Sequence, residues 1–394
     1  MITALKTKLA LILCLFNIVA IRAQGKAPEL SDRAQVSILT MGPGQNLNDA
    51  FGHNAIRIKD PLYQLDIVFN YGVYDFSTPN FYGKFAQGKL NYLLGVNRYA
   101  DMLNSYMQQN RLIREQILAI SKEQKQAFAD YLYNNAKPEN RAYLYDFFYD
   151  NCATKIRDVS QISLNNEIKF HAPNDFQPKT FRENIHDHVN QNSWGSLGID
   201  LALGSIIDRT AKPEEHMFLP KYIFDFFANA THQGNPLVKE TKVIFEPAHQ
   251  KVQNSWLVSP LVVFGILACI VLWLTYLDIK RGKRNRILDG VIFSFTGVLG
   301  VFLLLLWFAT DHTATAQNYN LLWAFPINLF ALLQAAKALP KRWFTNYISF
   351  LIIMLGLMGL HWVMGVQQFP IGVLPLYVAL LVRYIYIKRN LKSL

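Results

Sequence analysis

The feature that most constrains this chain of 394 residues is a series of apolar stretches in its C-terminal third. Five of them can be recognised, near residues 256–277, 288–309, 321–336, 347–366 and 371–387. A helix of about 20 apolar residues is long enough to cross the roughly 30 Å hydrocarbon core of a bilayer. The third stretch is shorter and contains Pro326 and Asn328, so we expect it to be kinked or partly buried. The sequence therefore predicts an all-α bundle of five transmembrane helices over residues 256–394.

The loops that join these stretches differ in charge. Basic residues follow the first, third and fifth stretches, namely Lys280, Arg281, Lys283, Arg284, Arg286, Lys337, Lys341, Arg342, Lys388, Arg389 and Lys392. The other two connections, 310–320 and 367–370, contain neither Lys nor Arg. Because Lys and Arg are retained in cytoplasmic loops, this alternation places the basic loops in the cytoplasm and the N-terminal part of the chain outside.

These loops also account for the net charge of +11, because the number of basic residues in them equals the excess of Lys and Arg over Asp and Glu in the whole chain. A nucleic-acid-binding protein would need a basic face on its soluble part. We therefore expect membrane lipid, and no nucleic acid, among the partners. Charged residues make up 17% of the chain and hydrophobic residues 51%, a composition that excludes a disordered protein.

Residues 1–23 carry the features of a secretory signal peptide. Lys6 and Lys8 precede an apolar run over residues 9–20, and Ala23 supplies a small residue for cleavage. An uncleaved anchor is the alternative, because Ile21 is an unfavourable residue at the third position before the cut. In both cases residues 24–255 are predicted to form an exported domain, which agrees with the loop charges.

The exported domain contains a single cysteine, Cys152, which therefore has no partner for an intrachain disulfide. Such a thiol is either a buried small hydrophobe or a nucleophile. Asp150 and Asn151 are good N-cap residues, and residues 152–160 read as a helix that begins at the cysteine. The helix dipole and the unpaired N–H groups of the first turn would lower the thiol pKa, and these N–H groups could hold an oxyanion.

A thiolate nucleophile needs an imidazole partner, and His53 is the best candidate. Residues 50–58 and 64–70 read as two strands of a hairpin. If the hairpin is centred between residues 61 and 62, His53 faces Asn70 on one side of the sheet. Asn70 would then orient the ring, as the third member of a Cys-His-polar constellation.

The third catalytic residue depends on the register of this hairpin. A shift by one residue would give the role to Tyr71, and Asp66 is a weaker candidate from the same strand. A non-catalytic alternative also exists, in which Cys152 fills an aromatic core and His53 bonds to a backbone carbonyl. The remaining histidines before residue 255 are expected on the solvated surface, namely His171, His186, His188, His216, His232 and His249. We expect no metal site and no cofactor. Residues 114–133 are predicted to form an amphipathic helix.

Several segments resemble known enzymes. The sequences Gly52-His53-Asn54-Ala55 and Asp150-Asn151-Cys152-Ala153 are similar to those of circularly permuted NlpC-type, papain-like enzymes such as lecithin:retinol acyltransferase, in which the histidine precedes the cysteine. Together with residues 68–76 and 217–220 they resemble the Lnb family of bacterial lipoprotein N-acyltransferases. The resemblance covers nearly the whole mature chain, because that family also joins an exported domain to a membrane bundle. It implies an α+β fold, with a permuted papain-like domain over residues 24–255 followed by the five-helix transmembrane domain.

The resemblance also implies an activity and a location. The chain would be a multi-pass protein of the bacterial inner membrane, with its N-terminal domain in the periplasm. A phospholipid would donate a fatty acyl chain to Cys152 as a thioester, and His53 would act as the general base. The acceptor would be the α-amino group of diacylglyceryl-cysteine on an apolipoprotein.

Some residues are candidates for substrate binding. Asp311 and His312 lie in the polar external loop 311–320, where they could hold a lipid headgroup or line the acceptor site; an ordinary solvated loop is the alternative. Asn151 and Tyr71, which neighbour Cys152 and Asn70 in the sequence, complete this group.

Two other functions compete with acyl transfer. A membrane-anchored cysteine peptidase or amidase acting on cell-wall peptide would use the same residues, although such an enzyme has no need of five membrane spans. A non-catalytic lipid-binding scaffold would leave the cysteine inert.

Overall fold

The computed structural model describes residues 27–248 and 256–392, so the predicted signal peptide lies outside the described residues. The chain divides into two compact units. The sheet unit contains residues 27–81, 90–177 and 213–248, and the helical unit contains residues 82–89, 178–212 and 256–392. Two stretches of the predicted exported domain, 82–89 and 178–212, therefore group with the membrane bundle.

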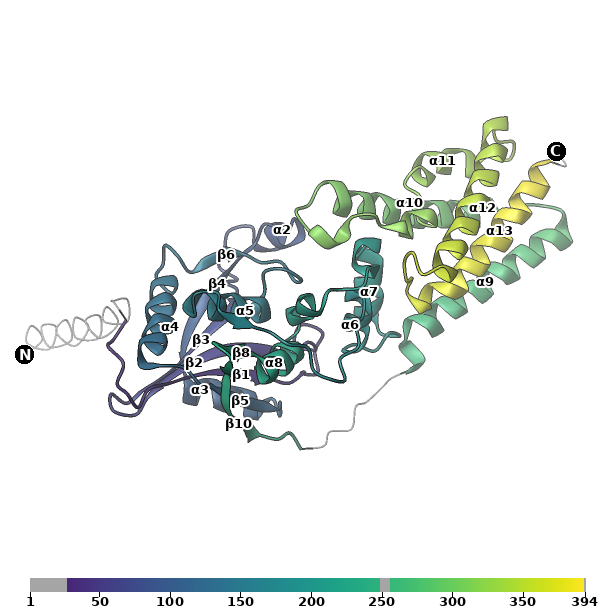
Figure 1. Ribbon diagram of the computed structural model, residues 1–394. Coiled ribbons are helices and arrows are strands. Elements are labelled where there is room, and N and C mark those ends of the chain that lie inside the picture. Colours follow the sequence, from purple (N-terminus) through teal and green to yellow (C-terminus); the bar gives the residue numbers. More distant parts are fainter. Residues whose placement is uncertain (1–26, 249–255, 393–394) are drawn as a thin grey trace, which may run out of the picture. The chain divides into compact units, whose positions relative to one another are not determined.

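The sheet unit is built on a seven-stranded antiparallel sheet of order β10-β5-β1-β2-β3-β4-β6 (Figure 1). Its strands are β1 (Gln35–Met41), β2 (His53–Asp60), β3 (Leu65–Val73), β4 (Asn91–Arg98), β5 (Ile113–Leu118), β6 (Ala142–Leu144) and β10 (Val238–Phe245). A small second sheet contains β7 (Ile168–Lys169), β8 (Thr231–His232) and β9 (Asn235–Pro236). The helices of this unit are α3 (Tyr99–Gln108), α4 (Lys122–Asn135), α5 (Cys152–Ser163), the 3₁₀ helix η3 (Pro213–Phe218) and α8 (Pro220–Asn229). Helix α2 (Phe81–Ala86) lies at a boundary between the two units.

The central strands are buried on both faces. Residues of β1 alternate between the two faces, as a strand requires. Val36 and Ile38 pack in the main core, which contains side chains from α4, α5 and α8. Leu39 and Met41 pack in a smaller core with Met102 of α3. The sheet is thus fixed from both sides, which holds the strand ends in place.

The predicted helix over residues 114–133 is wrong. The first part is strand β5, which pairs with β1 and β10, and the helix begins only at Lys122. Ser121 caps it by accepting from the backbone N–H of Gln124, whose side chain bonds back to Ser121. The strand has three polar residues between Ile113 and Ile117, and these two isoleucines are four residues apart, a spacing that also fits one face of an amphipathic helix.

The helical unit contains the predicted membrane bundle (Figure 1). Among the described residues, four segments are long and apolar enough to cross a membrane: Pro260–Arg281, Arg286–Phe308, Arg342–Val363 and Ile371–Leu391. These correspond to α9 (Pro260–Arg281), α10 (Arg286–Phe308), α12 (Arg342–Val363) and α13 (Leu374–Lys392). The short 3₁₀ helices of this unit are η2 (Ser205–Asp208), η4 (Trp256–Val258), η5 (Thr313–Thr315), η6 (Tyr319–Leu322) and η7 (Ile371–Val373).

The third predicted span is much shorter than the others, so the count of five transmembrane helices is approximate. Its helix, α11 (Asn328–Ala335), has eight residues and is about 12 Å long. Asn328 begins it and is fully buried, donating to Thr296 (2.8 Å) and accepting from the Tyr347 hydroxyl (2.5 Å). The sequence prediction that this stretch is partly buried is confirmed.

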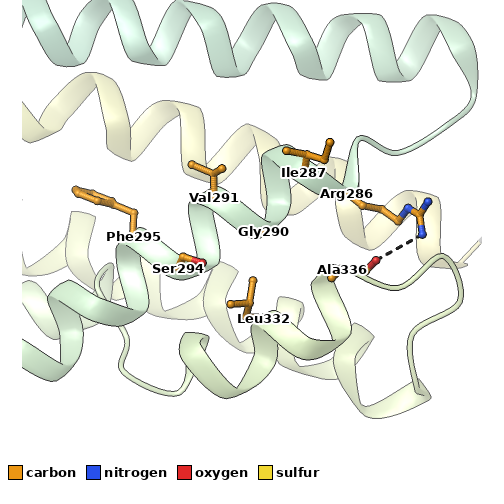
Figure 2. Close-up of a pocket in the computed structure, with 8 residues that line it drawn as sticks. All are labelled: Arg286, Ile287, Gly290, Val291, Ser294, Phe295, Leu332 and Ala336. Carbon is orange, nitrogen blue, oxygen red and sulfur yellow. Dashed lines mark hydrogen bonds between the residues drawn. The ribbon is translucent and has the colours of Figure 1, made fainter.

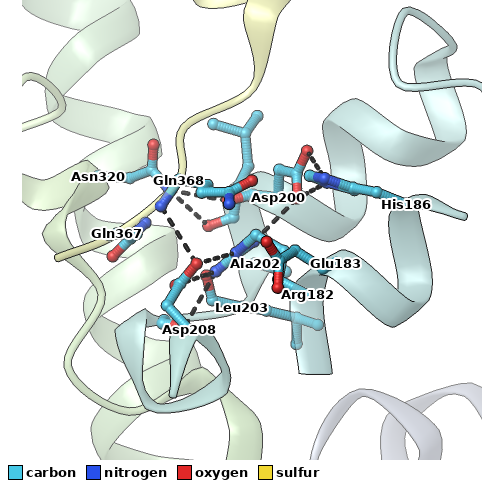
Figure 3. Close-up of polar contacts among 12 residues, drawn as sticks. Arg182, Glu183, His186, Asp200, Ala202, Leu203, Asp208, Asn320, Gln367 and Gln368 are labelled. Carbon is cyan, nitrogen blue, oxygen red and sulfur yellow. Dashed lines mark hydrogen bonds and ion pairs between the residues drawn. The ribbon is translucent and has the colours of Figure 1, made fainter. Parts of the chain in front are cut away.

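Residues 178–212 join the helical unit through a buried network around Arg182 (Figure 3). The segment contains α6 (Phe181–His186) and α7 (Trp194–Ala202). Arg182 has no exposed surface and donates to Asp200 (2.8 Å) and Asp208 (2.9 Å). Asn320 and Gln368, which flank the membrane helices, donate to the backbone oxygen of Asp200 and to the Asp208 carboxylate. These bonds explain why this part of the exported sequence packs with the bundle.

Candidate active site

Cys152 is the first residue of α5, as the sequence predicts. The Asn151 side chain caps the helix by accepting from the backbone N–H groups of Ala153 (2.8 Å) and Thr154 (2.9 Å). The Thr154 hydroxyl accepts from the Asn151 N–H in return, which completes a capping box. Two of the first-turn N–H groups that could have held an oxyanion are therefore already used.

Asn151 also connects helix α5 to residues 217–220 by a hydrogen bond. Its side-chain NH₂ group donates to the backbone oxygens of Phe147 (2.6 Å) and Phe218 (2.8 Å). Phe218 belongs to the stretch 217–220 that resembles the family. Asn151 is buried and its polar atoms all bond to protein, so it has no polar group left for a substrate, although it had been predicted to be a substrate-binding residue.

His53 begins β2, and its ring bonds to Asn70 of β3. Nε2 of His53 donates to Oδ1 of Asn70 over 2.5 Å. Gly52, immediately before the histidine, has φ of +83°, and a Cβ there would lie 2.7 Å from the Met41 carbonyl oxygen. Glycine is therefore required at this turn, which sets the direction in which His53 enters the sheet.

The hairpin register differs from the predicted one by two residues. Ile56 pairs with Phe69, so the hairpin is centred between residues 62 and 63, and the predicted centre between 61 and 62 is wrong. A shift of two keeps every side chain on the same face of the sheet. His53 and Asn70 therefore still meet, as diagonal instead of directly opposed neighbours.

The other candidates from β3 do not join this site. Tyr71 points to the opposite face, is buried in the main core, and donates its hydroxyl to Asn135 (2.5 Å). Asp66 forms an ion pair with Arg57 (2.7 Å). Tyr71 was also a predicted substrate-binding residue, and the structure gives it a place in the core instead.

The Cys152 thiol and the His53 ring lie against the same glycine. A Cβ on Gly72, which has φ of +94°, would lie 3.6 Å from Cβ of Cys152 and 4.0 Å from Cε1 of His53. A side-chain hydrogen bond between the thiol and the ring contributes to the pKa shifts of both groups. Since Nε2 is engaged by Asn70, Nδ1 is the nitrogen available to the thiol. Cys152 and His53 both remain partly exposed, so the pair is within reach of a substrate.

The contact between Cys152 and His53 lowers the pKa of the thiol and raises the pKa of the ring, so the charged form of each is favoured. Burial favours the neutral forms of both side chains, but their mutual attraction and hydrogen bond outweigh it. The pKa of Cys152 is lowered by His53 and by backbone hydrogen bonds from Asn54 and Ala153. The pKa of His53 is raised by Cys152 and then by Asn70, against a smaller opposing effect of Arg111. Both shifts favour the thiolate–imidazolium form of the pair.

Aromatic side chains surround the pair. The Tyr106 ring of α3 stacks on the His53 ring at 6.5 Å between centroids, and burial raises the pKa of Tyr106 to about 12. Tyr145 stacks on Tyr92 at 4.2 Å, and burial, with a smaller contribution from the Cys152 charge, raises the pKa of Tyr145. Tyr106 was not among the predicted site residues, although it lies four residues after the buried Met102 and therefore on the same face of α3.

Asp311 and His312 belong to the helical unit, not to the unit that holds Cys152. The Asp311 backbone N–H donates to the Gln87 carbonyl (2.8 Å), and Nε2 of His312 bonds to the Phe85 carbonyl (3.2 Å). A Cβ on Gly88 would come within 3.0 Å of the His312 nitrogen, so segment 82–89 packs closely on this loop. The loop is therefore attached to segment 82–89 by hydrogen bonds and close packing.

The prediction that the remaining histidines lie on the solvated surface is wrong for several of them. His216 has no exposed surface and contacts the ring of Phe176, and His232 is also buried. His186 bonds to Asp200 (3.0 Å) beside Arg182. Among the described residues, no group of three His, Cys, Asp or Glu side chains is arranged to hold a metal ion.

Two domains of one known family match this chain. The family described as the Lnb N-terminal periplasmic domain matches residues 30–185, which include His53, Asn70 and Cys152. The family described as the Lnb transmembrane domain matches residues 252–393, which include all helices from α9 to α13. No curated protein and no solved structure matches the chain. These matches and the four apolar helices identify a multi-pass membrane protein with a periplasmic domain. The chain belongs to the Lnb family.

Proposed function

We propose that this protein is a lipoprotein N-acyltransferase with Cys152 as nucleophile. The observation that carries the proposal is the arrangement of Cys152, His53 and Asn70, in which a thiol meets a ring that is itself oriented by an amide. This is the arrangement of a papain-like site with the histidine strand placed before the cysteine helix. Its occurrence in a protein with a membrane bundle favours substrates that are presented at the lipid surface.

In the first half-reaction the Cys152 thiolate attacks the ester carbonyl carbon of a phospholipid. The carbonyl oxygen becomes an oxyanion, for which the N–H of Cys152 itself is available, because the first residue of a helix has no intrahelical partner. The tetrahedral intermediate then collapses and the ester C–O bond breaks. The His53 imidazolium gives its Nδ1 proton to the leaving lysophospholipid oxygen, and an acyl thioester remains on Cys152.

In the second half-reaction the α-amino group of diacylglyceryl-cysteine attacks the thioester. Neutral His53 removes a proton from the nitrogen, the C–S bond breaks, and an amide forms on the lipoprotein. The thiolate and the imidazolium are restored together, so no further acid or base is needed. A low thiol pKa helps both halves, since the same sulfur must attack an ester and leave from a thioester.

The second step requires that the amine reaches the thioester before water does. The aromatic groups around the pair supply apolar walls, with Tyr106 on the His53 ring and the stacked Tyr145 and Tyr92 near the sulfur. Burial keeps these tyrosines protonated, so they do not act as competing bases at neutral pH.

The acyl-enzyme gives a direct test. The purified full-length protein is incubated with phospholipid in the absence of an acceptor, and its intact mass is measured. We expect an increase equal to one fatty acyl group, which disappears in the Cys152→Ser variant. Cys269→Ser is the matched control, because Cys269 lies exposed on α9 and its loss should leave the adduct unchanged.

A second arm adds a diacylglyceryl-cysteine peptide to the acylated protein. The adduct should disappear as the peptide gains the same mass at its α-amino group. Absence of any adduct on the wild-type protein would contradict the mechanism. Cleavage of a cell-wall peptide without acyl transfer would instead identify a cysteine peptidase or amidase.

A further inference from the structure

A groove with a volume of about 790 Å³ lies between α10 and α11 of the helical unit (Figure 2). Gly290, Val291 and Phe295 of α10 form one wall, and Leu332 of α11 lies opposite. Ser294 adds one hydroxyl, and Arg286 stands at one end. The groove is therefore apolar along its length and carries a positive charge at one terminus.

The groove exists because α11 is short and because residue 290 is glycine. Helix α10 has 23 residues and α11 has only eight. Helix α11 therefore covers only part of the length of α10. A Cβ on Gly290 would lie 3.7 Å from Cδ1 of Leu332, and a larger side chain would occupy the groove. Val291 is 61% exposed and Phe295 is 51% exposed, on a helix that crosses the membrane.

The two arginines near the groove are used differently. Arg284 is buried and is neutralised by Asp289 (3.1 Å). Arg286 is exposed and reaches across the groove, where its guanidinium donates to the Ala336 carbonyl (3.5 Å) (Figure 2). This bond uses one of the five N–H donors of the guanidinium. Among the described residues, no carboxylate forms an ion pair with Arg286.

The charged end of the groove lies at the cytoplasmic face. Helix α9 follows the periplasmic domain and ends at Arg281, so the start of α10 at Arg286 is on the cytoplasmic side. We propose that this groove binds an anionic phospholipid of the cytoplasmic leaflet. Its phosphate contacts Arg286, and one acyl chain lies along Gly290 and Phe295. Basic pockets between transmembrane helices on the cytoplasmic side commonly select acidic headgroups.

This site is independent of the proposed acyl transfer, which concerns lipids of the outer leaflet. The bound lipid fills the space left by the short α11 and stabilises its contact with α10. An anionic lipid is favoured over a zwitterionic one because the charge of Arg286 is uncompensated, whereas a choline or ethanolamine headgroup brings its own cation.

A second groove supplies a natural comparison. It lies on α9, has a volume of about 580 Å³, and is lined by apolar side chains, Gly265 and Cys269, with no charged residue. A Cβ on Gly265 would have nothing within 4 Å. It can accept an acyl chain, but it has no group for a phosphate.

The test measures lipid retention on the full-length protein by native mass spectrometry. The protein is taken from nanodiscs of phosphatidylcholine that contain a minor share of phosphatidylglycerol with the same acyl chains. We expect the wild-type protein to retain one phosphatidylglycerol preferentially. Arg286→Gln should weaken this retention about fivefold, which corresponds to one basic residue at a lipid surface. Gly290→Phe should abolish it by filling the groove.

Two controls keep the result interpretable. Gly265→Phe fills the comparison groove and should leave phosphatidylglycerol retention unchanged, and Arg286→Lys should keep most of it. Equal retention of both lipids by the wild-type protein would overturn the proposal. So would an unchanged preference in Arg286→Gln, or an equal loss in Gly265→Phe and Gly290→Phe.

Discussion

Arg182 in the helical unit and His53 in the sheet unit are both largely enclosed by protein, but their surroundings differ. Every nitrogen of the Arg182 guanidinium donates to a protein oxygen: Nε and Nη2 to Asp208, Nη1 to Asp200, and Nη2 also to the carbonyls of Leu203 and Gly204. The His53 ring has one nitrogen fixed by Asn70 and the other turned toward a thiol. All bonds of the first group go to carboxylates and carbonyls that only hold it in place, whereas the second group contacts a thiol that can itself react.

Buried charged groups of these two kinds differ in whether they can take part in a reaction. When the members of an ion network bond only to one another and to backbone groups, none is left for a substrate, and removing one partner leaves the other charges buried and unpaired. A thiol–imidazole pair whose members shift each other's pKa can exchange a proton with a ligand. The helical unit repeats the first pattern near its cytoplasmic end, where Arg383 bonds to Asp278 and Asp289. Such a pattern indicates a role in stability, and the Cys152 pair indicates chemistry.

The largest effect is expected for His53→Ala. Without the imidazole the thiol loses its proton acceptor and its counter-charge, so acylation of Cys152 should fall at least about 1,000-fold. The rate of adduct formation with phospholipid, followed by intact mass, measures this loss. Thermal unfolding should change little, because the ring is not part of the main core. An unchanged acylation rate would show that the pair is not the reactive centre.

Arg182→Gln is expected to lower the stability of the protein and to leave the reactivity of Cys152 unchanged. Removing the guanidinium leaves Asp200 and Asp208 buried without a cation, at a cost of about 3–5 kcal/mol in the free energy of unfolding. Alkylation of Cys152 by iodoacetamide, measured below the unfolding temperature, should stay at the wild-type rate. Arg209→Gln is the control, because Arg209 is exposed and its loss should cost less than about 1 kcal/mol. Equal destabilisation by both variants would mean that the buried network around Arg182 has no special role in stability.

The parts of this molecule that depend on local sequence were predictable. Helix α5 begins at Cys152 because Asn151 is a strong N-cap, and the four long membrane helices follow from apolar length alone. The contact between His53 and Asn70 was predicted despite a wrong register, because strand side chains alternate with period two and the error was two residues.

The parts that depend on distant partners were not predictable. Nothing local in residues 178–212 shows that Arg182 will meet Asp200 and Asp208, or that Asn320, more than a hundred residues later, will bind the same segment. The histidines were misplaced for the same reason, since a polar loop sequence does not reveal that His216 will be enclosed by aromatic rings. The use of the Asn151 amide was hidden because one of its acceptors, Phe218, lies 67 residues away.

The smallest effect is expected for Asn70→Ala, which keeps the reactive pair and removes only the group that orients it. The loss of one hydrogen bond to the ring should lower the acylation rate about tenfold. The hydrogen bond from Asn70 raises the pKa of His53, so its removal should lower that pKa, while the pKa of Cys152 remains below its usual value. On the alkaline side, the thiolate–imidazolium pair is lost when His53 gives up its proton. The pH range of rapid acylation should therefore narrow from its alkaline side, with the acid limit less affected.

The matched control for Asn70→Ala is Asn70→Asp, which keeps an oxygen near Nε2 and adds a negative charge. A carboxylate at that position should raise the pKa of His53 further and widen the pH range on its alkaline side. The pH profile of Cys152 acylation distinguishes the two variants even if both are slower than wild type. Identical alkaline limits in wild type, Asn70→Ala and Asn70→Asp would mean that Asn70 does not act through the imidazole. In that case the pair would be oriented by Tyr106 stacking alone, which Tyr106→Leu would then reveal.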